Sequence, residues 1–365
     1  MRLAPQLDRL KDALRASARV AAGIQSLDGS MPAGHNGPHG DVETPLRATS
    51  NWLQVFLRAW QETGDAQYRD CAARCVEYLL EPRHRPASIF RCHEVTQKLH
   101  SNGPIGQAWV VDALASGARV LDHGECARIA AEVVLAHPFD EALGLWHAVE
   151  VDGTSRGVYA TLNQQIWLAA AASRLPFAMR DGVLDRRIDR FVSRLPMYMN
   201  LRADGTVCHL LELGWHARVR RRVARFRNRE MLHRQDRGYH TFLLAGLARL
   251  HRARSLEPGW RFRSKIRRAL LPLLDDEWRR KLDEDPFSWS YNSTGFEAAF
   301  ALLTFRDLLP RADIESAAAL WISEQLDRHF DDSTGLMNRA TDDPATLSSR
   351  ICQAIDLIAD GRLQA

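Results

Sequence analysis

Five stretches of the sequence combine residue types that could bind a sugar and transfer protons. The first, GPHGDVETPLRATSNWL, places Asp41, Glu43, Arg47, Asn51 and Trp52 close together. The other four carry a similar mixture of amides, carboxylates and aromatic rings: His93, Glu94, Asn102, Gln107, Trp109 and Asp112; Trp146, Tyr159, Asn163, Gln164 and Trp167; Asp236, Tyr239 and His240; and Trp289, Tyr291, Asn292 and Glu297. Polar tips bind sugar hydroxyls while aromatic faces pack on the apolar CH face of the ring, so this mixture predicts a carbohydrate pocket.

Asp112, Asp41 and His240 are the candidates for catalysis. Two carboxylates that face each other across a pocket can have different pKa values, which leaves one as acid and the other as base. Histidine serves the same chemistry near neutral pH. Each residue also has a structural alternative. Asp112 could form a buried salt bridge, Asp41 could cap the helix that follows it, and His240 could be a hydrogen-bonding residue at a helix start.

The other polar residues are candidates for substrate binding. Arg47 could bind a substrate carboxylate in a bidentate manner, or it could pair with Glu43 four residues earlier. Glu297 could contact the ligand or neutralise an arginine of the inner helices. Asn163 and Gln164 are suited by type to the recognition of hydroxyl groups.

No motif indicates a nucleotide, a metal or a serine nucleophile. The sequence lacks a phosphate-binding GxxxxGK[ST], a GxGxxG after a strand and a GxSxG elbow. His35 and His39 flank glycines in GHNGPHG, which predicts a mobile loop at the pocket rim, and no third ligand has an obvious metal-binding spacing. The six cysteines form no CxxC pair, which is typical of reduced thiols. We therefore expect no metal and no cofactor.

The composition predicts a globular protein with a large core. Hydrophobic residues make up 45% of the 365 residues and charged residues 26%, without a proline-rich or Ser/Gly-rich linker. No apolar run is long enough for a signal sequence or a membrane span, so we expect a cytoplasmic protein. The net charge is +4, but residues 216–237 hold nine Arg against one Glu and one Asp, a local +7 that leaves −3 for the rest. Basic residues confined to one segment do not indicate a nucleic-acid-binding face.

Apolar residues recur at helical spacing along the chain, and alternating strand patterns are scarce. Gly64-Asp65, Asp181-Gly182, Pro310 and Asp343-Pro344 mark helix ends. Helices with a charged face alternate with helices that are apolar almost all round, which predicts an all-α fold, an (α/α)6 toroid with an inner ring of six helices enclosed by an outer ring. The twelve predicted helices cover residues 5–24, 43–63, 66–80, 103–119, 123–136, 160–174, 183–198, 238–253, 261–281, 292–308, 313–329 and 345–360.

The spacing of the inner helices predicts a single domain over residues 1–365. Their predicted starts lie 59, 59, 78, 53 and 53 residues apart, and the longest interval contains the arginine-rich segment, which we interpret as a loop insertion at about 214–237. All inner helices of such a ring start at the same end, so the polar stretches are expected to meet around one central cavity. The predicted starts are Glu43, Asn102, Thr161, Tyr239, Asn292 and Ala345.

The stretches GPHGDVETPLRATSNWL, NGPIGQAWVVDAL, LNQQIWLAAA, GYHTFLLAGLA and NSTGFEAAFA resemble the six-hairpin glycosidase-like proteins, and within them the unsaturated glucuronyl hydrolases and the AglQ-type proteins of surface-glycan gene clusters. The hydrolases use an Asp within an inner helix to protonate the C4=C5 double bond of a terminal unsaturated uronic acid. Asp112 in WVVDAL matches that place, and Asp41 in GDVET would correspond to a second family Asp. The resemblance implies a glycoside hydrolase that acts on an acidic, uronic-acid-containing oligosaccharide or polysaccharide by carboxylate acid/base chemistry.

Two other functions stay open. The N-acylglucosamine 2-epimerases have a similar helix count but depend on histidines of later inner helices, and here His240 is present while the last inner helix, ATLSSRICQAIDLIAD, has no His. The protein could also be a non-catalytic glycan-binding factor of polysaccharide biosynthesis. The arginine-rich insertion departs from the family outline and could be a solvated loop, a lid that attracts an anionic glycan, or a peripheral contact to a membrane surface.

Overall fold

The computed structural model describes residues 1–180, 182–213, 229–254, 259–309 and 314–360. Residues 214–228 of the predicted insertion lie outside the described residues, as do Asp181 and Pro310. The rest of the insertion forms a short helix, α9 (Arg229–Gly238). No helix in the described ranges is both long and apolar enough to cross a membrane.

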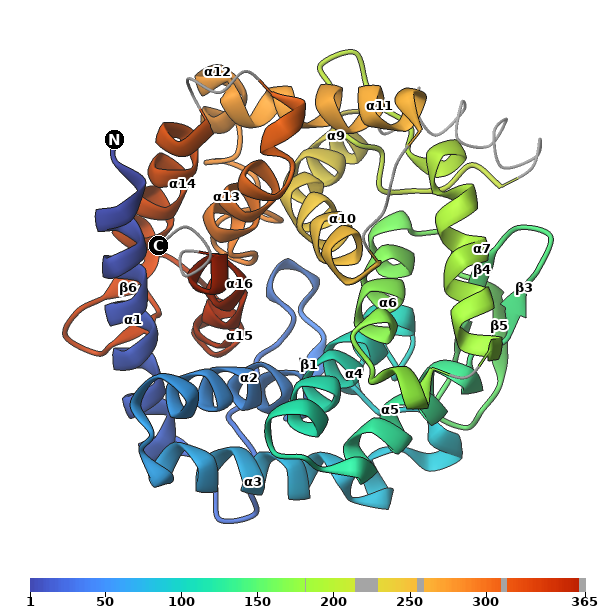
Figure 1. Ribbon diagram of the computed structural model, residues 1–365, viewed down its shortest axis with the longest axis vertical. Helices are drawn as coiled ribbons and strands as arrows, with labels where there is room; N and C mark the ends of the chain where they lie inside the picture. Colours follow the sequence, from blue (N-terminus) through green and yellow to red (C-terminus); the bar gives the residue numbers. More distant parts are fainter. Residues whose placement is uncertain (181, 214–228, 255–258, 310–313, 361–365) are drawn as a thin grey trace.

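The helices form two concentric rings, which confirms the predicted (α/α)6 toroid (Figure 1). Neighbouring inner helices contact one another around the ring, and α1 closes it by packing against α14, α16 and α2. The inner ring consists of α2 (Leu46–Thr63), α4 (Gly103–Val120), α6 (Leu162–Ser173), α10 (His240–Arg254), α13 (Thr294–Thr304), and α15 (Pro344–Ser349), which continues through a 3-10 turn (Arg350–Gln353) into α16 (Ala354–Asp360). The outer ring consists of α1 (Leu3–Ile24), α3 (Ala66–Leu80), α5 (Gly124–Ala136), α7 (Gly182–Tyr198), α11 (Trp260–Leu270) and α14 (Ile314–His329).

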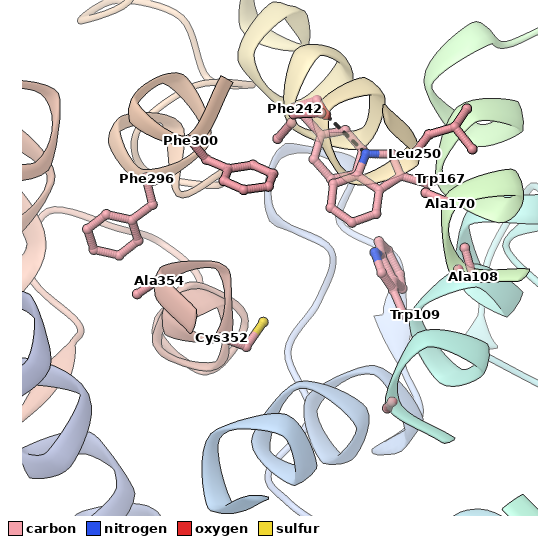
Figure 2. Close-up of a cluster of buried hydrophobic side chains, with 14 of the residues drawn as sticks. Ala108, Trp109, Trp167, Ala170, Phe242, Leu250, Phe296, Phe300, Cys352 and Ala354 are labelled. Atoms are coloured by element: carbon pink, nitrogen blue, oxygen red, sulfur yellow. Dashed lines mark hydrogen bonds between the residues drawn. The ribbon is translucent and has the colours of Figure 1, made fainter. Parts of the chain in front are cut away.

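Burial follows the two kinds of helix that the sequence distinguishes. Every residue of α4 from Gly103 to Ala118 is buried, whereas α7 buries only one face. Small residues let the inner helices approach closely: a Cβ on Gly246 of α10 would lie 2.8 Å from the indole Nε1 of Trp167 on α6. Trp167 stacks on Phe242 with ring centroids 4.7 Å apart and donates a hydrogen bond to its carbonyl at 3.0 Å (Figure 2).

The predicted turn signals act at two helix ends that the structure describes. Gly64 adopts a φ of 72° and its N–H donates to the Trp60 carbonyl at 2.8 Å, which ends α2. Asp65 then accepts from the Gln67 N–H at 2.9 Å and caps α3. Asp343 caps α15 in the same way, by accepting from the Thr346 N–H at 3.1 Å ahead of Pro344.

The short strands of the structure were not predicted from the sequence. All pairs are antiparallel, and each strand is too short for a visible alternation of apolar and polar residues. The helix predicted from Glu43 begins three residues later, because the chain first pairs as β1 with β2. The strands are β1 (Val42–Glu43), β2 (His93–Val95), β3 (Phe139–Asp140), β4 (Leu145–Val149), β5 (Ser155–Val158), β6 (Phe330–Asp331) and β7 (Leu336–Met337), and the remaining short elements are α12 (Asp276–Arg280) and 3-10 turns at Gly37–His39, Pro82–His84, Pro86–Ser88, Phe177–Met179, Leu271–Leu274 and Arg306–Leu308.

Candidate active site

A cavity of about 480 Å³ opens where the inner helices begin. The structure brings seven of the predicted residues together in its wall: Asn102, Trp109, Tyr159, Asn163, Gln164, Tyr239 and Tyr291. The segment that precedes α2, which includes β1, reaches into the middle of the ring and forms part of this wall (Figure 1). The remaining wall is formed by Asn36, His39, Lys98, Ile105, Thr161, His209, Leu210, Gln235, Phe242 and Arg350.

The loop predicted to be mobile is held against the cavity by Asn36. The Asn36 amide oxygen accepts from the Tyr291 hydroxyl at 2.7 Å and from Arg47 at 3.2 Å, while its NH2 group donates to Asp41 at 3.0 Å. Gly37 has a φ of 52°, and a Cβ there would lie 2.2 Å from the Tyr291 ring. Only glycine therefore lets the loop lie this close to the aromatic wall.

Asp41 lies behind the wall rather than in it. Its oxygens accept from the Thr96 hydroxyl at 2.7 Å and from Asn36, and Lys98 is 3.5 Å away. Burial raises the pKa of Asp41, but these hydrogen bonds and the ammonium outweigh it and hold the pKa below its usual value. Asp41 therefore stays ionised, and its hydrogen bonds connect the loop at Asn36 to Thr96 in the segment after β2.

Lys98, His39 and Tyr239 form a hydrogen-bonded row along the cavity wall. The Lys98 ammonium lies 3.0 Å from Nδ1 of His39, and His39 Nε2 lies 2.6 Å from the Tyr239 hydroxyl oxygen. An ammonium has only donors, so Nδ1 accepts, Nε2 carries the proton, and the Tyr239 oxygen accepts from it. Burial, helped by Lys98, lowers the pKa of His39 to about 4, so the ring is neutral at pH 7. The Tyr239 O–H is left to donate to a ligand.

His209 and Asp236 form a second pair on the wall. Nδ1 of His209 lies 2.5 Å from Oδ1 of Asp236, and Arg202 donates through Nε to Oδ2 of the same carboxylate at 2.8 Å. Burial raises the pKa of Asp236, but the hydrogen bonds from His209 and the charge of Arg202 outweigh it and hold the pKa low. An ionised Asp236 orients the ring so that Nδ1–H donates, and the other nitrogen is the one available for proton transfer.

Two arginines lie at the aromatic part of the wall. The Arg47 guanidinium is sandwiched 4.0 Å from the Trp109 ring centroid and 5.5 Å from that of Tyr291, and it pairs with Glu43 at 2.8 Å. This is the i, i+4 pair that the sequence analysis offered as an alternative to direct carboxylate binding. Arg350 is in the wall itself, with Glu297 3.7 Å away.

Asp112 lies deeper in the ring, outside the cavity wall. One oxygen accepts from Arg174 and the other from Arg249 at 2.7 Å, and Arg249 also pairs with Asp356 of α16 at 2.7 Å. Burial raises the pKa of Asp112, but the two guanidinium groups outweigh it and lower the pKa. The geometry is that of the buried salt bridge that the sequence analysis considered beside catalysis.

His240 is also outside the wall and is fully hydrogen-bonded. Its Nδ1 accepts from the Val207 N–H at 3.1 Å, and its Nε2 donates to the Ala269 carbonyl at 2.8 Å. Burial lowers the pKa of His240 to about 4. The ring therefore joins α10 to two neighbouring segments, and neither nitrogen is directed at the cavity as a free acid or base.

The other predicted residues support the wall without forming it. The Gln107 side chain accepts from the Phe90 N–H and donates to the Phe90 carbonyl. Asn51 donates to the Ser349 hydroxyl at 2.9 Å, and Asn292 donates to the Phe287 carbonyl. His93 forms a hydrogen bond with the Leu99 carbonyl. The exposed Glu94 pairs with Arg91 at 3.5 Å. Four of the predicted tryptophans are buried in the core outside the wall: Trp52, Trp146, Trp167 and Trp289.

Several cavity residues were not predicted from the sequence, and among them His209, Lys98 and Arg350 have ionisable side chains. His209 lies between α7 and α9, and Lys98 lies in the loop after β2, where no helical periodicity exists. Arg350 opens a 3-10 turn inside the last inner helix. A search for basic residues in the non-helical stretches between inner helices would have identified His209 and Lys98, but not the residues with which they pair.

One sequence relative and several solved structures are similar to this chain. Archaeal glycosylation protein Q of Haloferax volcanii is 35% identical over 367 residues, which cover 95% of this chain and 97% of the relative. A D-mannose isomerase matches with a TM-score of 0.69 at 13% identity, covering 97% of this chain and 98% of its own. Cellobiose 2-epimerase from Spirochaeta thermophila (TM-score 0.63, 16% identity, 99% of each chain) and unsaturated glucuronyl hydrolase from Bacillus sp. GL1 (0.63, 14%, 96% of each chain) share the fold.

No family model matches the sequence. The identity to the archaeal relative extends over nearly the full length of both chains, and the structural neighbours share the (α/α)6 toroid fold. The resemblance drawn from the sequence motifs is thereby confirmed. The chain belongs to the family of archaeal glycosylation protein Q.

Proposed function

We propose that this protein is an enzyme of glycan assembly or modification that acts on an acidic, uronate-bearing sugar by proton transfer through His209. The observation that carries the proposal is the charge of the cavity wall. His39, Lys98, His209 and Arg350 are its nitrogen-based ionisable groups, and no carboxylate belongs to the part of the wall that the structure describes. A basic, aromatic and amide-rich wall suits an anionic sugar. The name of the relative, a glycosylation protein, supports a role in glycan assembly or modification.

The same observation favours an epimerase or isomerase. The usual retaining and inverting glycosidases need two carboxylates that flank the scissile bond. Here the side chain placed to take a proton is His209, oriented by Asp236. Removal of the proton from the carbon next to a sugar carboxylate leaves negative charge on the carboxylate oxygens, and cationic groups in the wall stabilise that charge. Tyr239 is placed to return or donate a proton through its hydroxyl.

Hydrolysis of a uronic-acid-containing glycan is the second candidate, and one observation favours it. Burial raises the pKa of Glu297 to about 7, although Arg350 and a hydrogen bond from Thr241 act to lower it. A carboxyl group with such a pKa can serve as a general acid near neutral pH. Glu297 would then need to reach the sugar past Arg350.

The test is incubation of the purified protein with saturated and unsaturated uronate-containing oligosaccharides in D2O. We expect deuterium at one ring carbon of the recovered sugar without cleavage, detected by NMR and mass spectrometry, and its loss in His209→Gln. His233→Gln is the matched control, because His233 also faces a carboxylate, Asp204 at 3.5 Å, but lies outside the cavity wall. New reducing ends would establish hydrolysis instead. Sugar binding without exchange or cleavage would leave a non-catalytic binding factor.

A further inference from the structure

Arg350 is a buried cation with an incomplete set of partners. Its side chain is 3% exposed, and its guanidinium lies 4.9 Å from the Tyr291 ring centroid and 5.4 Å from that of Phe242, both of which share the cavity wall. Its Nε has no hydrogen-bond partner among the residues that the structure describes. The Glu297 oxygen at 3.7 Å is beyond hydrogen-bonding distance.

The carboxyl group of Glu297 also has an incomplete set of hydrogen-bond partners in the described ranges. Its Oε2 accepts from the Thr241 hydroxyl at 2.9 Å, but its Oε1 is buried without a hydrogen-bond partner in the described ranges. The charged groups that face it are Arg350 from the 3-10 turn and Arg249 from α10. Burial raises the pKa of Glu297 to about 7, so near neutral pH the carboxyl group is ionised in only part of the molecules.

Apart from Glu297, the groups that face Arg350 in the described part of the chain supply no anion. The groups that face it are Glu297, Tyr291, Cys352 and Arg47, and burial together with Arg47 lowers the pKa of Arg350. Burial raises the pKa of Cys352, which keeps it a neutral thiol, and Glu43 already neutralises Arg47. A buried guanidinium without a matched anion is costly, and a planar carboxylate can satisfy it through two parallel hydrogen bonds.

We propose that Arg350 is the subsite for the carboxylate of the sugar, and that this carboxylate replaces Glu297 as the anionic partner of the guanidinium while Glu297 takes up a proton from solvent. The inference rests on the proposed function and adds to it where the acidic group lies and how its binding depends on pH. The sugar ring that bears the carboxylate would lie between Arg350 and His209, since both belong to the same wall.

The proposal fixes the sign of the pH dependence. Below the pKa of Glu297 the carboxyl group is neutral and Arg350 is free for the sugar, whereas above it the ionised Glu297 competes. Affinity for an acidic sugar therefore falls as the pH rises through about 7, by up to about tenfold per pH unit above that value. A neutral sugar of the same shape has no carboxylate and shows no such dependence.

Calorimetric titration tests the proposal with a glucuronosyl-glucose disaccharide and the glucosyl-glucose disaccharide of the same linkage. Titrations at pH 6, 7 and 8, each in two buffers of different ionisation enthalpy, give both the affinity and the number of protons taken up. We expect proton uptake with the acidic sugar only, and Glu297→Gln to abolish the uptake and the pH dependence while binding persists. Arg350→Met is expected to lose at least about tenfold of the preference for the acidic over the neutral sugar.

Arg263→Met is the matched control, because Arg263 is an exposed arginine paired with Asp307 at 3.0 Å outside the cavity wall. An acidic-sugar preference that survives Arg350→Met, or proton uptake that survives Glu297→Gln, overturns the subsite while leaving the proposed function intact. If thermal melting shows that Arg350→Met does not fold, the same two measurements, the preference for the acidic sugar and the proton uptake, are made on Arg350→Lys and Glu297→Gln. Failure of the unmodified protein to bind either sugar contradicts the proposed function itself.

Discussion

A single oxygen of Asp236 holds His209 at two points. Oδ1 accepts from the His209 ring at Nδ1, 2.5 Å away, and from the His209 backbone N–H at 2.9 Å. Arg202 donates to the other oxygen. Both the position of the chain and the orientation of the ring are thus set by one carboxylate, which is the arrangement that a histidine acting as a base requires.

Asp236→Asn is expected to lower kcat far more than it changes KM. The amide no longer holds a negative charge against the imidazolium that forms when His209 takes a proton, so we expect a loss of about 10²-fold or more in kcat. It also leaves Arg202 without its anion, which costs about 3 kcal/mol of stability. Kinetics and thermal melting are measured together. Asp204→Asn, which affects the peripheral His233, is the control and should leave kcat unchanged.

Lys98→Met is expected to raise the pKa of His39. Burial and the Lys98 charge 3.0 Å away together lower this pKa to about 4, so removal of the ammonium reverses only the effect of the charge. Titration of the imidazole nitrogens by NMR measures both the pKa and the tautomer. In the unmodified protein the proton should be on Nε2, and in Lys98→Met the two tautomers should both be populated. A proton on Nδ1 in the unmodified protein would contradict the assigned direction of the Lys98–His39–Tyr239 row.

The architecture could be predicted from the sequence because each ring of helices has its own hydrophobic pattern. Inner helices such as α4 are buried on every side, whereas outer helices such as α7 bury one apolar stripe of side chains. The capping residues at Gly64-Asp65 and Asp343 are local signals of helix ends. Three of the cavity amides, Asn102, Asn163 and Gln164, could be predicted for the same reason, since they lie at the starts of inner helices. Asn36 and Gln235 do not lie at such starts and were not predicted. Strands of two to five residues carry no comparable pattern.

The pairing of charges that lie far apart in the chain could not be predicted from the sequence. Asp112 meets Arg174 and Arg249, which lie 62 and 137 residues further along the chain, and only the closed ring brings them together. His209 and Asp236 are likewise 27 residues apart, with His209 before the arginine-rich segment and Asp236 near its end. A residue type and a place on a helix show that a carboxylate is buried, but its partners decide whether it is a free acid or one member of an ion pair.

The stability of the fold is expected to fall between pH 6.5 and 4. Burial lowers the pKa of His137 and of His240 from 6.5 to about 4, so the unfolded chain binds protons in this range and the folded chain does not. Stability is complete above the unfolded pKa and is lost as the pH falls toward the folded one, by up to about 3 kcal/mol for each group. Denaturant titrations at several pH values measure the slope. His240→Gln should reduce it, and an unchanged slope in that variant would contradict the assignment.

Asp112→Asn separates the two roles that the sequence allows for this residue. The structure predicts a loss of about 3 to 5 kcal/mol in the free energy of unfolding, because Arg174 and Arg249 lose their shared anion in a buried place. Removing one cation as well, in Asp112→Asn with Arg174→Met, should recover part of that loss, because Arg174 is then the cation without its anion whereas Arg249 keeps Asp356. A catalytic acid would behave differently: kcat per folded molecule would fall with stability unchanged, and the second substitution would restore nothing. Denaturant unfolding and active-site-normalised kinetics on the same samples distinguish the two outcomes.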